Sequence, residues 1–360
     1  MAKEPITEAE VVEALGSIVD PELGRSLGDL KMLNRVSVRD NGAIEVDVEL
    51  PTPAYPRRER IVDLIRSRVS EKLPQAHETS VTFSWNVRGK ESGARIGLRA
   101  KNVIAVGSGK GGVGKSTTAA MLAYGLKHYG AAVGLMDADV YGPSIPHLIG
   151  AKGEPAMVEK QGANGQIINR IQPVEHNGMK VMSMAFMVSE DQAVIWRGPM
   201  LHKLLTQFLQ ETDWGELDYL IIDLPPGTGD VSLTLSQLLG LAGAVVVCTP
   251  QKVALLDAVK AISMFKQVKI PVLGIVENMS GEIFGRGGAK QKADELGIPF
   301  LGEIPIEADI RIKGDEGRIA ALLDEGCPSR PHLLGVCEAI AIQIARQLLD
   351  EPSMPTLELL

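Results

Sequence analysis

Cysteine, aromatic residues and long apolar runs are all scarce in this chain. Only 3 of the 360 residues are cysteine, and 4% are aromatic. No two cysteines lie at short spacing, which argues against a disulfide framework and suits a reducing compartment. The longest apolar stretch, Leu238–Cys248, is interrupted by two glycines and is too short to cross a membrane. We therefore expect a cytoplasmic protein without a membrane partner.

Positive charge is not in excess either. The formal net charge is −8, so we expect no nucleic-acid partner. The first residues, Met-Ala-Lys-Glu-Pro, lack the apolar core of a secretion signal. Hydrophobic residues make up 45% of the chain and charged residues 23%, which is ordinary for a globular protein. A chain of 360 residues is long enough for two or three domains.

The strongest chemical pattern lies in residues 103–117. It begins with an apolar run typical of a buried strand and continues as Gly-Lys-Gly-Gly-Val-Gly-Lys-Ser-Thr. This is the phosphate-loop pattern G-x-x-x-x-G-K-[ST], with Gly109, Gly114, Lys115 and Ser116 at the fixed positions. Glycines leave backbone N–H groups free to face phosphate, and a helix that begins near Lys115 adds its positive end.

The loop pattern predicts a role for each of its polar side chains. Lys115 can reach the β- and γ-phosphates of a nucleotide, and the Ser116 hydroxyl can hold Mg²⁺. A glycine-rich turn that binds nothing is the alternative, and the strand before and the helix after disfavour it. The predicted nucleotide-binding residues are Gly109, Lys110, Gly111, Gly112, Val113, Gly114, Lys115, Ser116 and Thr117.

Three aspartates follow predicted strands further along the chain. Asp137 and Asp139 come after the strand 132–136, and Asp223 closes the strand 219–222. Carboxyl ends of strands form the ligand edge of an open α/β sheet. A hydrophobic strand that ends on an aspartate is typical of the Mg²⁺ side of a phosphate-loop NTPase, so Asp223 is predicted to share the metal with Ser116. Helix capping is the alternative role for Asp137 and Asp139.

Strand and helix patterns alternate between residues 101 and 350. This alternation predicts an α/β domain with a doubly wound, mainly parallel sheet and helices on both faces. Residues 89–100, charged and glycine-containing, are predicted to be a linker, and residues 351–360 a loose tail. Besides those named above, the expected elements are helices at 116–129 and 333–349 and strands at 244–248, 272–276 and 299–301.

Residues 1–88 are predicted to form a separate small α+β domain. A capping box at Thr7–Glu10 opens a helix that is expected to run to about Val19. Strands at 36–38 and 44–50 flank a turn and predict a hairpin, followed by a helix at 58–73 and a strand at 80–87. Asp20 and Glu22 are candidate functional carboxylates; a solvated turn at the helix end is the alternative.

The second lysine of the loop, Lys110, gives the first family resemblance. A loop of the form G-K-G-G-V-G-K-[ST] resembles that of the dimeric ATPases that include nitrogenase iron protein, MinD, ParA and the Mrp/ApbC iron–sulfur carriers. The segments 196–200, 223–230 and 277–280 also resemble segments of Mrp/ApbC proteins. Residues 1–88 resemble a small iron–sulfur assembly domain, whose standalone members often carry a cysteine where this chain has Tyr55.

The resemblance implies an ATP-hydrolysing homodimer that carries iron–sulfur clusters and works with apoproteins or scaffold proteins. It implies that Lys110 reaches the nucleotide of the partner subunit. One of Asp137 and Asp139 would orient the attacking water, and the other would help the Mg²⁺ shell. Asn278 would contact adenine, for which an amide suits the purine edge, unless it only forms a turn. Residues 196–200 are expected near the dimer face, or have no special role.

One departure from the family pattern leaves the cluster ligands unknown. Many members carry Cys-x-x-Cys after the Glu-Asn-Met-Ser segment, whereas residues 281–288 here contain no cysteine. Two such pairs across a dimer would supply the usual four thiolates. Cys248 and Cys337 fit buried positions, and Cys327, in a predicted loop, is expected to be the most accessible thiol.

An iron–sulfur cluster is therefore expected from the resemblance alone, and two other functions stay open. The first is a cluster-free, ATP-driven partner switch that acts as an adaptor. The second is a MinD- or ParA-like positioning ATPase. MinD-like membrane binding would need a basic amphipathic C-terminal helix. The end of this chain, residues 350–360, is acidic and interrupted by proline, which disfavours that function.

Overall fold

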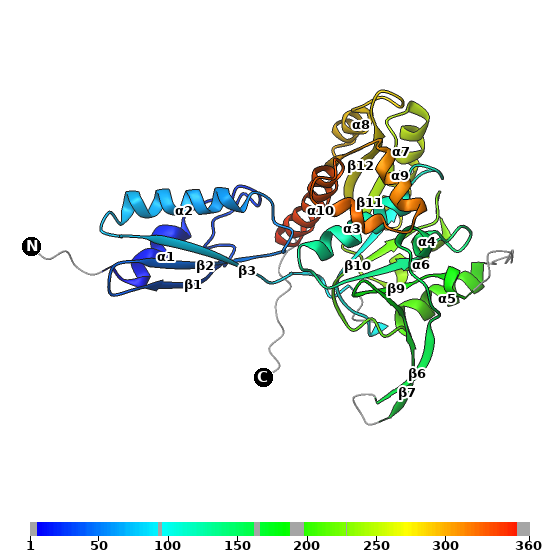
Figure 1. Ribbon diagram of the computed structural model, residues 1–360, viewed down its shortest axis with the longest axis horizontal. Helices are drawn as coiled ribbons and strands as arrows, with labels where there is room; N and C mark the ends of the chain where they lie inside the picture. Colours follow the sequence, from blue (N-terminus) through cyan, green and yellow to red (C-terminus); the bar gives the residue numbers. More distant parts are fainter. Residues whose placement is uncertain (1–5, 93–95, 162–165, 188–197, 228, 351–360) are drawn as a thin grey trace, which may run out of the picture. The chain divides into compact units, whose positions relative to one another are not determined.

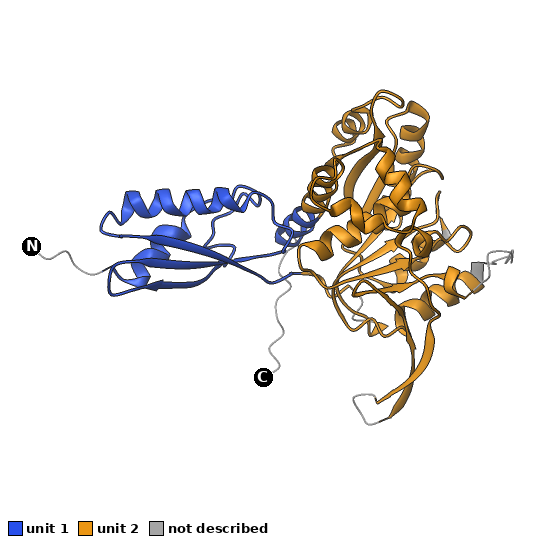
Figure 2. Ribbon diagram, viewed as in Figure 1, with its two compact units in different colours: residues 1–88, 341–360 blue, residues 89–340 orange. Residues whose placement is uncertain are grey.

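The structure, a computed structural model, describes residues 6–92, 96–161, 166–187, 198–227 and 229–350. The chain divides into two compact units (Figure 2). The smaller unit comprises residues 1–88 and 341–360, and the larger comprises residues 89–340. The predicted tail at 351–360 lies outside the described residues, and the two units are described separately below.

The boundary between the units differs in detail from the expected linker at 89–100. The larger unit begins at Gly89, and its first strand, β4, begins at Arg99. Residues before β4 are held by it, because Val103 N–H donates to Ser92 Oγ at 3.3 Å. A Cβ on Gly89 would lie 2.3 Å from the Lys101 carbonyl oxygen, so this segment runs directly against the strand.

The larger unit is built on an eight-stranded sheet with the strand order β13-β12-β11-β4-β10-β5-β9-β8 (Figure 1). Neighbouring strands are parallel except β8, which is antiparallel to β9. The prediction of a mainly parallel sheet is confirmed. The strands are β4 (Arg99–Gly107), β5 (Val133–Asp137), β8 (Val174–His176), β9 (Met179–Met182), β10 (Glu216–Asp223), β11 (Gly243–Cys248), β12 (Val272–Ser280) and β13 (Phe300–Pro305).

Helices cover both faces of this sheet. Side chains of α5, α6, α7 and α8 form one buried core with the strands, while α3 packs on β4, β5 and β10 outside that core. Strands covered on both faces are continuous apolar runs, which is why β11 is buried at every residue. The helices are α3 (Lys115–His128), α4 (Ile145–Ile149), α5 (Gly198–Gln210), α6 (Asp230–Leu238), α7 (Lys252–Gln267), α8 (Gly288–Leu296), α9 (Ala308–Asp315) and α10 (Arg330–Asp350), with 3₁₀ turns η2 (Met184–Phe186) and η3 (Ile319–Leu323).

A two-stranded hairpin of β6 (Ala156–Gln161) and β7 (Ile167–Gln172) projects from the larger unit (Figure 1). The sequence did not predict it, nor β8 and β9. These strands are short, and most side chains of β6 and β7 are exposed, so their pattern carries little apolar periodicity.

The smaller unit is a three-stranded sheet covered by two helices. In the order β1-β2-β3, β1 is antiparallel and β3 parallel to the central strand. The predicted hairpin is present, but the first helix stops at Gly16 instead of about Val19, because Val19 pairs with Ser26 in a β-bridge. The elements are α1 (Glu8–Gly16), β1 (Leu33–Val38), β2 (Ile44–Leu50), α2 (Arg58–Lys72) and β3 (Thr79–Trp85).

The C-terminal part of α10 belongs to the smaller unit. Ile342 is buried in the core of this unit, and Leu349 packs against the same core. Arg346 donates to the Glu22 carbonyl from Nε at 2.8 Å and from Nη2 at 2.6 Å. The small domain therefore includes side chains from both ends of the sequence.

In the described ranges, α10 is the one helix long and apolar enough to span a membrane by length and composition. Its first half is buried in the larger unit at Leu333, Val336, Cys337 and Ile340. A helix that fills a protein core has the same composition as a membrane span, and this packing accounts for the apolar character of α10.

Candidate nucleotide-binding site

The phosphate loop connects the end of β4 to the beginning of α3. Gly112 and Gly114 adopt φ values of 77° and 80°, which glycine tolerates without strain. A Cβ on Gly114 would lie 2.1 Å from Asn278 Nδ2, and one on Gly109 would lie 2.1 Å from the Asp257 carbonyl carbon. The fixed glycines are therefore required by backbone conformation and by close packing.

Lys115 is buried and paired with two carboxylates. Its Nζ lies 2.6 Å from Asp223 Oδ1 and 3.6 Å from Asp139 Oδ2. It also donates to Ser116 Oγ at 3.1 Å. The structure thus brings the loop lysine, the predicted metal residues Ser116 and Asp223, and one predicted catalytic aspartate into a single cluster.

The second carboxylate oxygen of Asp223 shows that this cluster suits a metal ion. Asp223 is completely buried, and its Oδ2 has no hydrogen-bond partner within the described part of the chain. A buried carboxylate oxygen without a partner is costly, and oxygen ligands are those that Mg²⁺ prefers. The Ser116 hydroxyl, which accepts from the same Lys115 ammonium, supplies a second oxygen. The residues present therefore fit a divalent cation.

The carboxylates of this cluster outnumber its cations. Burial, and after it the charge of Asp223, raises the pKa of Asp137 to about 7. Burial also raises the pKa of Asp223, although the neighbouring Lys115 ammonium opposes this. Three carboxylates around one ammonium leave net negative charge in a place with little water. Added positive charge would stabilise the site.

Asp137 is held on both oxygens. Its Oδ1 accepts from Asp139 N–H at 3.1 Å, and its Oδ2 accepts from Ser144 and Ile145 N–H at 3.1 and 3.2 Å. The Ser183 hydroxyl, at the end of β9, also donates to Oδ2 at 3.1 Å. This carboxylate ties the segment after β5 into a fixed turn. Ser183 was not predicted as a site residue, because the strand that precedes it was not predicted.

Asp139 has a different environment from Asp137. Its Oδ1 accepts one hydrogen bond, from Gly142 N–H at 3.2 Å, and its Oδ2 faces Lys115. Asp139 also lines a cavity of about 450 Å³ with Tyr141, Pro225 and Pro226. Of the two predicted catalytic aspartates, Asp139 is the one that faces both the loop lysine and open space.

The segment that follows Asp223 lies beside the phosphate loop. Gly227 N–H donates to the Ser108 carbonyl at 3.0 Å, and a Cβ on Gly111 would lie 3.9 Å from Pro226. Thr228 lies outside the described residues. The Pro-Pro-Gly turn thus contacts the phosphate loop directly.

Asn278 contacts the phosphate loop itself. Its Nδ2 donates to the Val113 carbonyl at 2.9 Å, and the residue is 5% exposed. The contact with adenine remains a prediction. The preceding residue, Glu277, was not singled out from the sequence; its carboxylate accepts from Gly287 and Ala289 N–H, both at 2.7 Å, and fixes the beginning of α8.

Lys110 is half-buried, and its carbonyl accepts from Ser108 Oγ at 2.9 Å. Within the described chain its ammonium makes no hydrogen bond or ion pair with another residue. This leaves the Lys110 side chain available for a group outside the subunit.

The residues predicted near a dimer face are partly described. Residues 196 and 197 lie outside the described ranges, while Met200, on α5, is 51% exposed. The role of this segment stays a prediction.

All three cysteines are buried. Burial raises the pKa of Cys248 and of Cys337 to about 12 in each case. The expectation that Cys327 is accessible is wrong: this residue is 9% exposed and lies 3.7 Å from the Lys313 ammonium. Across the described residues, no group of three or more His, Cys, Asp or Glu side chains converges as a ready-made metal site.

The sheet order, the loop between β4 and α3, and the aspartates at the strand ends together define a nucleotide-binding P-loop NTPase. The family model of the NUBPL iron-transfer P-loop NTPase matches residues 99–341, and that of the iron-sulfur cluster assembly protein matches residues 8–83. The chain belongs to this family of iron-transfer P-loop NTPases, with the assembly domain fused ahead of the NTPase.

Individual relatives agree with the family models. The iron-sulfur cluster carrier protein of Deinococcus radiodurans is 42% identical over 351 residues, covering 95% of this chain and 97% of the relative. A nucleotide-binding protein from Archaeoglobus fulgidus, solved with ADP, is 40% identical with a TM-score of 0.53, covering 65% of this chain and 95% of that protein. The cell division ATPase MinD of Pyrococcus furiosus has a TM-score of 0.50 at 19% identity, covers 66% of this chain and 98% of that protein, and shares the fold.

Proposed function

We propose that this protein hydrolyses ATP to ADP and phosphate and uses this reaction in the transfer of iron–sulfur clusters. The ion cluster of Lys115 with Asp223 and Asp139 is the observation that carries the enzymatic part. The phosphates of a bound nucleotide carry more negative charge than the two carboxylates that hold Lys115, so they would attract its ammonium group more strongly. Charge-assisted hydrogen bonds to the γ- and β-phosphates would then replace the two ion pairs.

When bound, Mg²⁺ would neutralise phosphate charge and occupy the place beside Ser116 and Asp223. The unpartnered Asp223 Oδ2 and the Ser116 hydroxyl are the groups that would hold it. As Lys115 turns to the phosphates, Asp223 loses its ammonium partner and needs this replacement. The nucleotide and the cation are therefore expected to bind together.

We assign the two strand-end aspartates different roles in hydrolysis. Asp139 would orient the attacking water, since it faces the lysine and the cavity. Asp137 would hold the turn that carries Asp139, because its oxygens already accept four hydrogen bonds from the chain. Lys110 would act across a two-fold homodimer on the γ-phosphate of the partner subunit, as an arginine finger does in trans.

The cargo is proposed from the family. Relatives named iron-sulfur cluster carrier protein cover nearly the whole chain, including both units. Since the thiols described here are buried, a transferred cluster would be held weakly or by groups other than these cysteines. Apoproteins that accept clusters, or scaffold proteins that supply them, are the proposed partners.

A second function, a cluster-free ATP-driven partner switch, is favoured by two observations. The segment 281–288 contains no cysteine, and burial raises the thiol pKa of two of the three cysteines. Metal ligation requires thiolate. Anaerobic reconstitution with iron and sulfide, followed by visible absorbance and iron content, separates the two functions.

Cys327→Ser is the informative variant in that experiment. Under the carrier proposal, wild type takes up a labile cluster that a mild chelator removes. A wild-type protein that takes up none while hydrolysing ATP supports the cluster-free switch. A stable cluster that survives Cys327→Ser would show that other ligands hold it.

Subunit mixing tests the trans role of Lys110. Lys110→Ala should keep ATP binding and lose hydrolysis by about 10³-fold or more, as in enzymes that lose a charge supplied in trans. Asp139→Ala should also be inactive. Mixing the two variants leaves one composite site with an intact lysine and an intact aspartate, so activity should reappear. Full activity of Lys110→Ala alone would refute the trans role.

A further inference from the structure

Apart from the β6–β7 hairpin, the described residues form two larger sheets with four edges in all, and three of these edges carry features that oppose pairing with another strand. The edge strand β13 contains Glu303 and ends on Pro305, β8 is three residues long, and β1 contains Arg35. Charge, proline and shortness are the usual protections of a sheet edge. The fourth edge, β3, reads Thr-Ser-Val-Thr-Phe-Ser-Trp and has none of them.

The odd-numbered residues of β3 share the face that carries the helices. Val81 and Phe83 pack against the core of the smaller unit. Alternation places Thr79 and Trp85 on the same face, at opposite ends of the strand. Trp85 is 46% exposed, so a large apolar ring stands beside the open edge. On the other face, the hydroxyls of Thr82 and Ser84 donate to Asp47 at 3.3 and 2.7 Å.

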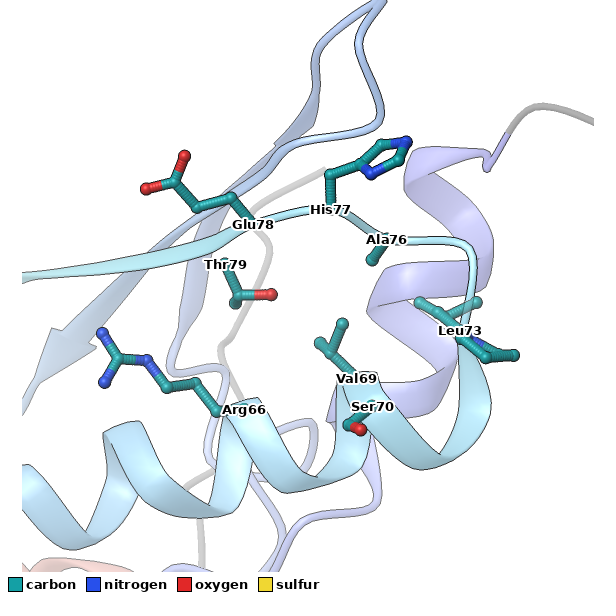
Figure 3. A pocket seen from close by; sticks show the side chains of 9 residues that line it. Arg66, Val69, Ser70, Leu73, Ala76, His77, Glu78 and Thr79 are labelled. Carbon is teal, nitrogen blue, oxygen red and sulfur yellow. The ribbon is translucent and has the colours of Figure 1, made fainter.

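A pocket lies at the opposite end of β3 from Trp85. It has a volume of about 330 Å³ and lies between α2 and the beginning of β3 (Figure 3). Val69, Leu73 and Ala76 give it an apolar part, Arg66 borders it from α2, and Thr79 borders it from the beginning of β3. Arg66, Ser70, His77 and Glu78 make much of its wall polar, so it suits a flat side chain with an apolar body and a polar edge, such as an indole.

We propose that a second copy of this chain pairs with β3 in an antiparallel arrangement about a two-fold axis at Thr82. In this register Thr82 faces itself, Val81 faces Phe83, and Ser80 faces Ser84. Thr79 then faces Trp85 of the second copy, and facing residues lie on the same side of the sheet. The tryptophan of each copy therefore reaches the pocket of the other, and the two sheets become one with six strands.

The proposed pairing brings complementary side chains together and places no like charges opposite each other. Val–Phe and Thr–Thr are favourable cross-strand pairs, and no charged residue faces a like charge along the seven-residue strand. Arg66 lies at the pocket that receives the indole ring, where a guanidinium can stack on the aromatic face. Because each copy supplies the same ring and the same pocket, the contact closes as a dimer.

This association does not involve the nucleotide site. All of its residues lie in the smaller unit, so it should form without ATP, whereas dimerisation through Lys110 requires nucleotide. If the protein proved not to hydrolyse ATP, the pairing of β3 strands could still be correct. If the strands proved not to pair, the proposed ATPase activity would be unaffected.

Cysteine cross-linking of the full chain, without nucleotide, tests the pairing and its register. The native thiols are buried, so background reactivity is low. In Thr82→Cys the new thiols face each other within disulfide reach, and mild oxidation should link two chains at least about tenfold faster than in the control. The matched control is Leu64→Cys, a 40% exposed position on α2.

The register follows from a mixed experiment. Ser80→Cys alone and Ser84→Cys alone should link slowly, whereas a mixture of the two should link rapidly. Cross-linking of Thr82→Cys no faster than Leu64→Cys would overturn the pairing. Rapid linkage of Ser80→Cys to itself would overturn the register.

Trp85→Ala gives a measurement without engineered thiols. Loss of a buried aromatic anchor should weaken nucleotide-free dimerisation by about thirtyfold, measured by sedimentation equilibrium. The far-ultraviolet spectrum and the unfolding midpoint of the variant show whether the chain remains folded. A monomeric wild type at high concentration, or an unchanged dissociation constant for Trp85→Ala, would contradict the proposal.

Discussion

Two fully buried carboxylates, one in each unit, show contrasting ways to stabilise a negative charge. Asp223 in the larger unit and Asp20 in the smaller one are both 0% exposed. In each, Oδ2 has no hydrogen-bond partner in the part of the chain that the structure describes. The groups around the other oxygen differ completely. This difference separates a site built for exchange of partners from one built for rigidity.

Asp20 is held by uncharged hydrogen-bond donors of the smaller unit. Its Oδ1 accepts from Glu22 N–H at 2.9 Å, from Leu23 N–H at 2.7 Å and from the Tyr55 hydroxyl at 2.5 Å. Burial, and then the hydrogen bond to Asp20, raises the pKa of Tyr55, so the hydroxyl stays a donor. The two backbone N–H groups and the Tyr55 hydroxyl are fixed in the fold and have no competing anion to bind.

Asp223, in contrast, is held by a lysine ammonium that a stronger anion can attract. Lys115 is the first residue of helix α3, next to the place where phosphates are expected to bind. A mobile cation can exchange a carboxylate for phosphate, while backbone N–H groups cannot. Burial alone thus does not distinguish a functional carboxylate from a structural one; the mobility of its partner does.

The largest effect in this comparison is expected for Lys115→Ala. Loss of a positive charge that makes charge-assisted hydrogen bonds should weaken Mg²⁺-ATP binding about tenfold to hundredfold. Nucleotide titration of the folded variant measures this. Lys127→Ala, at the other end of α3, is the matched control and should bind as wild type does. Equal affinity in Lys115→Ala would remove the basis of the nucleotide assignment.

Tyr55→Phe tests the rigid carboxylate. Removal of a hydroxyl that donates to a buried carboxylate should lower the free energy of unfolding of the smaller unit by about 2 kcal/mol. Denaturant unfolding, followed by a probe in the smaller unit, measures this, with the exposed Tyr141→Phe as control. The turnover of ATP per folded protein should not change. A lower turnover with unchanged stability would mean that Tyr55 acts in function.

Ser183→Ala should have a smaller effect, on catalysis. It removes one of four hydrogen bonds that hold Asp137, so the turn carrying Asp139 becomes looser. We expect kcat to fall about fivefold with KM nearly unchanged, which corresponds to one ordinary hydrogen bond. Ser183→Thr keeps the hydroxyl and should restore the rate. Equal kcat for Ser183→Ala and wild type would show that Asp137 needs no such support.

The remaining prediction is a pH dependence of stability. Since the folded state raises the pKa of Asp137 from its ordinary value to about 7, the native state holds more protons than the unfolded state between these values. Stability from this group is therefore complete at low pH and is lost as the pH rises to about 7. Comparison of nucleotide-free wild type with Asp137→Asn should isolate this slope. If the free energy of unfolding changed with pH in the same way in both proteins, this prediction would be wrong.

The sequence was sufficient where chemistry depends on local spacing. The phosphate loop is a contiguous pattern, and Asp137 and Asp223 could be placed because strand ends meet at one edge of a parallel sheet. These features need no knowledge of which distant side chains come together.

The sequence was insufficient where packing decides. Ser183 reaches Asp137 from a four-residue strand too short to show periodicity. Cys327 follows no buried pattern, yet the packing around Lys313 leaves it 9% exposed. The contact of Asn278 with Val113 depends on how closely the end of β12 approaches the loop. Each of these requires tertiary positions that spacing does not encode.

The contribution of α10 to the smaller unit has a consequence for synthesis. Ile342 and Arg346 are translated near the end of the chain, yet they pack on residues translated near its beginning. The N-terminal domain therefore cannot complete its core while the ribosome is still making the NTPase. A nascent chain that stops before residue 341 would expose the surface that these side chains cover. Premature termination would therefore leave the first domain incomplete, although the residues it lacks lie far along the chain.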